Sequence, residues 1–208
     1  MIKIHHLNHS RSQRILWFLE ELGVEYEIIF YARDKETRLA PDALKEVHPL
    51  GKSPVLEDGE VKIAESGAIV EYLARTYGEG RFAPAIDGGL YNKYTELLHY
   101  AEGSAMLPLM LGLYVGRLGE AGAPLGPRIK SETVNHIGYL SGLLGEGEFF
   151  VGDMLTGADI QLSFVFEAAS FGGTLKHFPN LQAYLDRLQA RPAYKKAIER
   201  GGEYRLGA

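Results

Sequence analysis

The stretch from residue 48 to 72 constrains the fold of this chain most, because several local signals follow one another within it. Pro54 precedes an apolar run, and proline, which cannot donate to a β-ladder, belongs at the first residue of a strand or on an edge. Asp58-Gly59 is a typical hairpin turn, and the residues at 61–64 follow as the returning strand. The stretch therefore predicts a β-hairpin that begins at a proline.

Helix signals follow directly after this hairpin. Glu65-Ser66 stands just before apolar side chains that recur at helical spacing. A serine at such a junction is a natural N-cap, and the N-terminus of the helix presents free N–H groups and the positive end of its dipole. The segment thus predicts unpaired backbone groups beside Pro54 and a helix N-terminus suited to an anion.

The order of these signals resembles the glutathione-binding half of the glutathione S-transferase family. In that family G-K-x-P-x-L-x-D-G leads to a hairpin, and (E/D)-S-x-A-I starts the next helix. This chain has G-K-S-P-V-L-E-D-G at 51–59 and E-S-G-A-I at 65–69, at the expected separation. The resemblance covers essentially the whole chain. It implies glutathione as a co-substrate, a role in detoxification and a homodimer.

Composition excludes several other classes of protein. The chain has 208 residues, 46% of them apolar, and a net charge of −5, so a substantial core is expected and nucleic acid is not an expected partner. There is no cysteine, which fits a reducing compartment and excludes a mechanism that uses a protein thiolate. No signal-peptide pattern and no run of about 20 apolar residues occurs. We therefore expect a soluble, cytoplasmic protein.

The pattern of elements divides the chain into two domains. Residues 1–78 are expected to form an α/β thioredoxin-like domain, βαβ-α-ββ-α with a mixed four-stranded sheet, an arrangement that rests on the family resemblance as well as on the periodicity. Residues 79–89 lose periodicity and predict a linker. Residues 90–208 are expected to form an all-helical bundle that carries the site for the second substrate.

Several details of the helical domain can be predicted. A long helix is expected at 90–118, with Pro108 kinking or breaking it, and a loop at 119–127. A helix at 128–144 is expected to turn the following residues inward: Ile129, Val134, Ile137, Leu140 and Leu144. Thr156 and Asp159 have the spacing of a capping box, which would open a very apolar helix.

The chemistry of the family is activation of the glutathione thiol. A free thiol has a pKa of ~8.5, and lowering it by ~2 units requires ~2.7 kcal/mol of preference for the anion. A hydrogen bond to a charged group supplies ~1.5–3 kcal/mol, and a helix N-terminus adds ~0.3–1 kcal/mol. One hydroxyl donor beside the first helix would therefore suffice.

Ser10 is the candidate for this donor. The segment 10–14 is similar to the S-x-x-x-R pattern of serine-type transferases, with Ser12 or Arg11 as the alternatives and plain helix capping by Ser10 as the structural explanation. Tyrosine-type members carry a tyrosine in the first strand, where this chain has His5 and His6. Cysteine-type members are excluded by composition. The chain is therefore similar to serine-type members of the theta-like, fungal and bacterial kind.

The resemblance implies that six residues bind glutathione: His48, Lys52, Ser53, Pro54, Glu65 and Ser66. The backbone of Ser53 would pair with the cysteinyl part, and Glu65 and Ser66 would hold the γ-glutamyl end. Lys52 and His48 would meet the glycyl carboxylate. Capping remains an alternative or additional role for Ser66, and His48 is equally well explained as a loop residue.

The second substrate is expected to lie against the long helix of the helical domain. The candidates lie at spacings near one helical turn: Tyr100, Met106, Met110 and Tyr114. Core packing is the alternative, preferred for at least half of them. Glu102 is a weaker candidate, for the ligand of the partner subunit. The seven histidines show no spacing typical of a zinc site, so no metal is expected.

The sequence thus predicts a glutathione transferase that attacks a hydrophobic electrophile with the glutathione thiolate. The same thiolate would also serve glutathione-dependent peroxide reduction. A non-catalytic, transferase-like binding or regulatory module is the alternative from another class, and it predicts no affinity for glutathione. A dehalogenase or isomerase that uses glutathione differently is the second alternative.

Overall fold

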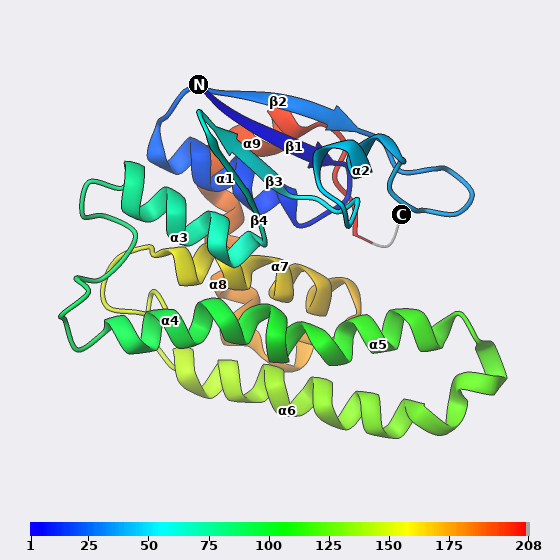
Figure 1. The fold of residues 1–208 in the computed structure, drawn as a ribbon. Coiled ribbons are helices and arrows are strands. Elements are labelled where there is room, and N and C mark those ends of the chain that lie inside the picture. The colour runs from blue at the N-terminus through cyan, green and yellow to red at the C-terminus, as the bar shows by residue number, and fades with distance from the viewer. Residues whose placement is uncertain (207–208) are drawn as a thin grey trace. The chain divides into compact units, whose positions relative to one another are not determined.

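The computed structural model describes residues 1–206, which fall into two compact units (Figure 1). The first unit consists of Met1–Ala83 together with the chain from Leu188 onward, and the second unit consists of Pro84–Arg187. This division differs from the expected one, because the last part of the chain belongs to the unit that contains the sheet. No helix within residues 1–206 has the length and apolar character needed to cross a membrane.

A four-stranded mixed sheet organises the first unit, as predicted for a thioredoxin-like domain. Its strands are β1 (Ile2–Leu7), β2 (Tyr26–Tyr31), β3 (Val55–Asp58) and β4 (Val61–Ala64), in the order β2-β1-β3-β4. β1 pairs with β2 in parallel, as a βαβ unit requires, and with β3 antiparallel. The hairpin register pairs Asp58 with Val61, so its two connecting residues are Gly59 and Glu60 and not Asp58-Gly59.

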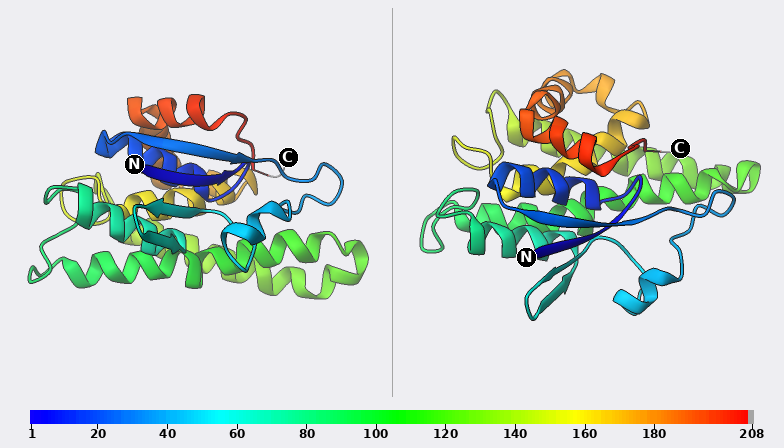
Figure 2. Two further views of the ribbon diagram at one scale, coloured as in Figure 1. Left: turned by 45° about the horizontal axis from the view of Figure 1, so that its top comes forward. Right: turned by 90° about the horizontal axis from the view of Figure 1, so that it is seen from above.

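Within the described residues, four α-helices lie wholly in the first unit. They are α1 (Ser12–Leu22), α2 (Ala43–Val47), α3 (Ser66–Tyr77) and α9 (Pro192–Gly201). α1 is buried along most of its length because it packs against the sheet, α3 and α9. α9 runs beside α1 although most of the chain separates them in sequence (Figure 2).

The second unit is helical, as predicted. Its α-helices are α4 (Tyr91–Tyr100), α5 (Met106–Gly116), α6 (Gly126–Leu144), α7 (Gly157–Phe171) and α8 (Pro179–Ala190), the last of which runs on beyond the unit boundary. 3-10 turns occur at Gly119–Leu125 and Leu175–His177. The first of these turns lies where a loop was expected.

Pro108 does not break the long helix. A π-helical turn, Ala101–Ala105, lies between α4 and α5, and Pro108 sits buried in the first turn and a half of α5. A proline inside a helix removes one hydrogen bond and crowds the carbonyl four residues earlier, and a wider turn just before it relieves this conflict. The helix therefore continues through Pro108, with a local change of helix type just before it.

The core of the second unit forms around α7. Thr156 and Asp159 make the predicted capping box, and Asp159 also accepts hydrogen bonds from the backbone of Phe150 and the hydroxyl of Tyr184. In α6 the expected inward residues Ile137, Leu140 and Leu144 are buried and Ile129 is half-buried. Val134 was predicted wrongly, since its side chain is 45% exposed and the neighbouring Thr133 is buried instead.

Candidate functional site

Ser10 lies in the turn that joins β1 to α1. Its side chain is buried, and its Oγ accepts a hydrogen bond from the backbone N–H of Ser12 at 3.2 Å. Its carbonyl oxygen accepts the N–H of Gln13 at 3.1 Å, while Arg11 occupies the N-cap position of α1. Ser10 therefore accepts hydrogen bonds from N–H groups in the first turn of α1, which have no partner within the helix. Its hydroxyl lies beside the positive end of the helix dipole.

A buried polar chain leads inward from Ser10. The Oγ atoms of Ser10 and Ser12 are 2.8 Å apart, and the Ser12 Oγ lies 2.8 Å from Nδ1 of His6. Nε2 of His6 lies 3.1 Å from the carbonyl oxygen of Gly201 at the end of α9. Burial lowers the pKa of His6 to about 4, so its imidazole is neutral at physiological pH. Sequence reasoning missed this chain, since nothing local links residues 6 and 201.

Ser53 anchors the loop before β3 to the end of β1. Its Oγ donates to the carbonyl of His5 at 2.8 Å and accepts the N–H of Leu7 at 3.2 Å. The Ser53–Pro54 peptide bond is cis. Among residues 1–206, the backbone N–H and C=O of Ser53 have no hydrogen-bond partner. These groups can therefore pair with an extended peptide-like ligand.

Ser66 begins α3, and its hydroxyl oxygen accepts a hydrogen bond from Nη2 of Arg14 at 2.5 Å. Both side chains are almost fully buried. The expected capping role of Ser66 was wrong, because Glu65 is the N-cap residue and the Ser66 hydroxyl is engaged by the guanidinium. The first N–H groups of α3 and the cation of Arg14 together favour an anion at this helix end.

Glu65 holds an unusual backbone conformation, with φ 68° and ψ 116°. A non-glycine residue with positive φ costs about 1–3 kcal/mol and occurs preferentially at ligand sites. The Glu65 side chain is exposed, so its carboxylate is accessible to a cationic group. The strained backbone turns this residue away from the regular course of the strand and helix that flank it.

Lys52 and His48 lie in the loop between α2 and β3. Lys52 is exposed and, among residues 1–206, pairs with no carboxylate. Nδ1 of His48 accepts the N–H of Leu50 at 3.4 Å, which supports the loop role that the sequence left open. Lys52 precedes Ser53 directly, so its charge is available next to the unpaired backbone groups.

The four residues expected at the second-substrate site have different surroundings. The hydroxyl of Tyr100 lies 2.6 Å from Nδ1 of His136 in α6, and burial, with Tyr139 and Glu96, raises the pKa of Tyr100 to about 12. Met106 is buried, Met110 is half-buried, and Tyr114 is 56% exposed. Tyr100 is thus bonded to α6 and Met106 is buried, which leaves Met110 and Tyr114 as the more accessible pair.

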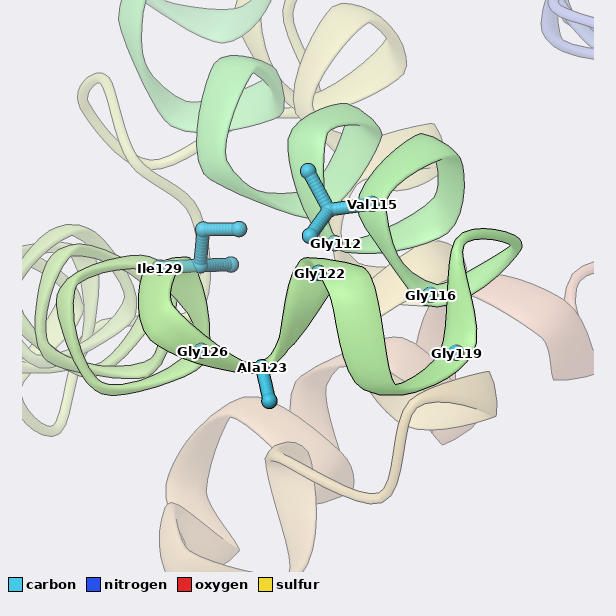
Figure 3. A pocket seen from close by; sticks show the side chains of 8 residues that line it. All are labelled: Gly112, Val115, Gly116, Gly119, Gly122, Ala123, Gly126 and Ile129. Carbon is cyan, nitrogen blue, oxygen red and sulfur yellow. The ribbon is translucent and has the colours of Figure 1, made fainter.

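A small pocket lies at the end of the α5–α6 hairpin (Figure 3). It is lined by glycines and three apolar side chains: Gly112, Val115, Gly116, Gly119, Gly122, Ala123, Gly126 and Ile129. None of the expected site residues lines it. With no polar side chain it offers no group for catalysis. Within residues 1–206, no three acidic or histidine side chains are grouped so that they could hold a metal ion.

Comparison with known proteins identifies the family. Residues 1–75 match the glutathione S-transferase N-terminal domain, and residues 127–200 match the glutathione S-transferase C-terminal domain. The chain belongs to the glutathione S-transferase family. It is a glutathione transferase enzyme with glutathione as its co-substrate.

Similar transferases are aligned over nearly the whole chain. Glutathione S-transferase 3 of Schizosaccharomyces pombe is 36% identical over 96% of this chain and 88% of the relative. Glutathione S-transferase 1 of Saccharomyces cerevisiae is 31% identical over 96% of this chain and 95% of the relative. A crystal structure of a glutathione S-transferase from Actinobacillus pleuropneumoniae is 34% identical and superimposes with a TM-score of 0.86, covering 97% and 93% of the two chains.

Proposed function

We propose that this transferase is of the serine type and that the Ser10 hydroxyl stabilises the glutathione thiolate for attack on a hydrophobic electrophile. The position of Ser10 carries the proposal. Its hydroxyl lies beside the N-terminus of α1, at the end of a strand whose last residues are bonded to Ser53. A hydroxyl donor and a helix dipole supply roughly the ~2.7 kcal/mol that a two-unit fall in thiol pKa requires.

The same geometry supports a mode of glutathione binding. The unpaired backbone groups of Ser53 suit the cysteinyl residue, whose peptide groups have the same hydrogen-bonding pattern. The exposed carboxylate of Glu65 suits the γ-glutamyl ammonium, while the N-terminus of α3 with Ser66 suits the neighbouring carboxylate. The exposed cation of Lys52 suits the glycyl carboxylate, with His48 as a second candidate.

Met110 and Tyr114 are the residues of the helical unit that we propose for contact with the electrophile, since their side chains reach solvent. A flexible methionine and an exposed aromatic ring suit varied apolar groups. Peroxide reduction would use the same thiolate. We further propose a cytoplasmic homodimer, as is typical of the family; sedimentation equilibrium at micromolar concentration tests the dimer directly.

Thiolate absorbance of bound glutathione against pH tests the role of Ser10. In the native protein we expect the bound thiol to ionise about 2 units below its free pKa of ~8.5. Ser10→Ala should return the pKa close to the free value, and Ser10→Thr, which keeps a hydroxyl, should keep most of the shift. An unchanged pKa in Ser10→Ala would transfer the role to Ser12 or Arg11. No glutathione binding at all would favour the non-catalytic module.

A further inference from the structure

The hydrogen bonds that link Ser10, Ser12, His6 and Gly201 run in one donor-to-acceptor direction, and the bond between His6 and Gly201 determines it. The carbonyl oxygen of Gly201 can only accept a hydrogen bond, so the facing Nε2 of His6, 3.1 Å away, must carry a proton. His6 is only 1% exposed, and burial lowers its pKa to about 4, with a smaller contribution in the same direction from the charge of His9. The imidazole is therefore neutral, and its Nδ1 is an acceptor.

The direction of the first bond determines the next two. Nδ1 of His6 accepts, so the Ser12 hydroxyl donates its one proton to it, at 2.8 Å. Within residues 1–206, the only other acceptor for this proton is the carbonyl of Leu7, the last residue of β1, at 3.2 Å. Whichever of these two acceptors takes the hydroxyl proton of Ser12, none is left to donate to Ser10. Across the 2.8 Å between the two Oγ atoms, Ser10 is therefore the donor and Ser12 the acceptor. All three bonds thus point inward, toward α9.

We propose that His6 and Ser12 are positioning residues that hold the hydroxyl proton of Ser10 inward and thereby limit the acidity of the glutathione thiol bound at Ser10. This rests on the proposed role of Ser10 as the donor to the sulfur. When Ser10 points inward, it offers the sulfur a lone pair, which favours the neutral thiol. When it turns outward to the thiolate, the bond to Ser12 is lost.

The hydrogen bonds from Ser10 through Ser12 and His6 to Gly201 cannot all be reversed while His6 is neutral. Ser12 could donate to Ser10 only if it released both inner acceptors. Moving the His6 proton to Nδ1 would place the Nε2 lone pair against the Gly201 carbonyl, where two acceptors would face each other in a buried site. The chain therefore opposes thiolate formation by about the net contribution of one hydrogen bond, which corresponds to roughly 0.5–1 pKa unit.

Ser12→Ala is the deciding variant, because it removes the acceptor for the Ser10 proton and leaves the backbone N–H of residue 12 in place. We expect the pKa of bound glutathione, followed by thiolate absorbance, to fall by roughly 0.5–1 unit below the native value. The acid limb of the pH profile of kcat/KM with an aryl halide should shift by the same amount. Ser12→Ala in a Ser10→Ala background should change nothing further, since the chain acts only through Ser10.

His6→Leu provides a second, independent variant. Leucine has no acceptor in the place of Nδ1, so the proton of Ser12 is held inward only by the carbonyl of Leu7 at the longer distance of 3.2 Å. We expect a smaller shift in the same direction as for Ser12→Ala. Ser163→Ala is the matched control, because Ser163 is an equally buried serine that donates to the carbonyl of Ile160 in the second unit.

The outcomes separate this inference from the proposed function. A thiol pKa that rises or stays unchanged in both Ser12→Ala and His6→Leu, while Ser10→Ala raises it, overturns the inward direction of the hydrogen bonds and leaves Ser10 as the donor. No effect of Ser10→Ala overturns the proposed function itself. If Ser12→Ala does not fold, as judged by circular dichroism, the shift measured in His6→Leu decides: a fall in the thiol pKa supports the inference, and an unchanged or higher pKa overturns it.

Discussion

Single residues in this transferase carry a structural cost, and Glu65 shows this most clearly. Its backbone has a positive φ of 68° at the start of α3. Such a conformation costs about 1–3 kcal/mol in a residue with a Cβ atom. Glycine would avoid most of this cost, and the bond that we propose between the Glu65 carboxylate and the γ-glutamyl ammonium gives a reason for glutamate at this position.

Two substitutions at Glu65 should separate stability from affinity. Glu65→Gly should raise the free energy of unfolding by about 1 kcal/mol, because relief of strain exceeds the added chain entropy. Glu65→Gln should leave stability nearly unchanged, since the strained backbone stays. Both should weaken glutathione binding about tenfold or more through loss of the bond to the ammonium. Urea unfolding and titration calorimetry measure the two effects; full affinity in Glu65→Gln would contradict the assignment.

At this scale the sequence predicted where several residues lie in the fold, but not which side chains they contact. The positions of Ser10, Ser53 and Glu65 at element junctions followed from local motifs, because caps, turns and strand starts are set by neighbours in the chain. The partners of their side chains did not follow. Arg14 reaches Ser66, and His6 reaches Gly201, through tertiary packing, so the capping role expected for Ser66 was replaced by a contact with a residue in another helix.

The elements of the first unit are joined by ion pairs as well as by apolar packing, and Glu20 of α1 is the main example. Its carboxylate accepts from Arg200 at 2.6 Å and from the hydroxyl of Tyr26 at 2.7 Å, and it lies 2.7 Å from the ammonium of Lys196. Burial alone would raise the pKa of Glu20, but the bonds from these three groups hold it below its ordinary value. The carboxylate thus ties α1 to both β2 and α9.

Glu20→Gln should destabilise the protein in a pH-dependent way. We expect a loss of about 2 kcal/mol at pH 7, because the donors around residue 20 lose a charged partner. The folded-state pKa of Glu20 is depressed, so its contribution is complete above its ordinary pKa of 4.5 and is lost as the pH falls through the folded-state value. The difference between the two proteins should therefore shrink below about pH 4.5 in urea unfolding.

Glu27→Gln is the matched control for this measurement. Glu27 also lies close to a lysine, at 3.8 Å from Lys3, but both side chains are nearly half exposed. We expect a change within about 0.5 kcal/mol at every pH. An equal effect of both substitutions would mean that the Glu20 network contributes no more than an ordinary surface pair.

Element types were predictable where one local signal dominated. The capping box at Thr156 and the βαβ unit followed from short-range patterns. The π-helical turn before Pro108 did not, because proline predicts a local conflict and does not specify how the helix resolves it. In α6 the burial of Thr133 in place of Val134 depends on which neighbours the helix meets, and periodicity alone does not contain that information.

At the scale of the whole molecule, the two units can be followed separately. The chain has one tryptophan, Trp17 in α1, and it is fully buried in the first unit against Tyr194 of α9, with ring centroids 5.5 Å apart. Its fluorescence therefore reports on that unit, whereas helical circular dichroism reports on both. The sequence suggested one boundary near residue 78, but it could not show that the last helix belongs to the first unit.

Tyr194→Ala should lower the stability of the first unit by about 3 kcal/mol, the usual cost of removing a large buried aromatic side chain. The Trp17 fluorescence transition should move to lower urea concentration accordingly. Tyr139→Ala, at a 44% exposed position in the second unit, should leave that transition within about 0.5 kcal/mol of the native one. A Trp17 transition that does not respond to Tyr194→Ala would show that α9 contributes little to the unit.

The contribution of α9 to the first unit also has a consequence during synthesis. A ribosome delivers residues 1–83 early, but α9 begins only at Pro192, after the whole second unit has been made. Until then the face of α1 that carries Trp17 lacks its cover, and exposed apolar surface on a nascent chain invites aggregation or chaperone binding. The first unit is therefore expected to close only after Pro192–Gly201 has emerged, although its sheet is made before the second unit.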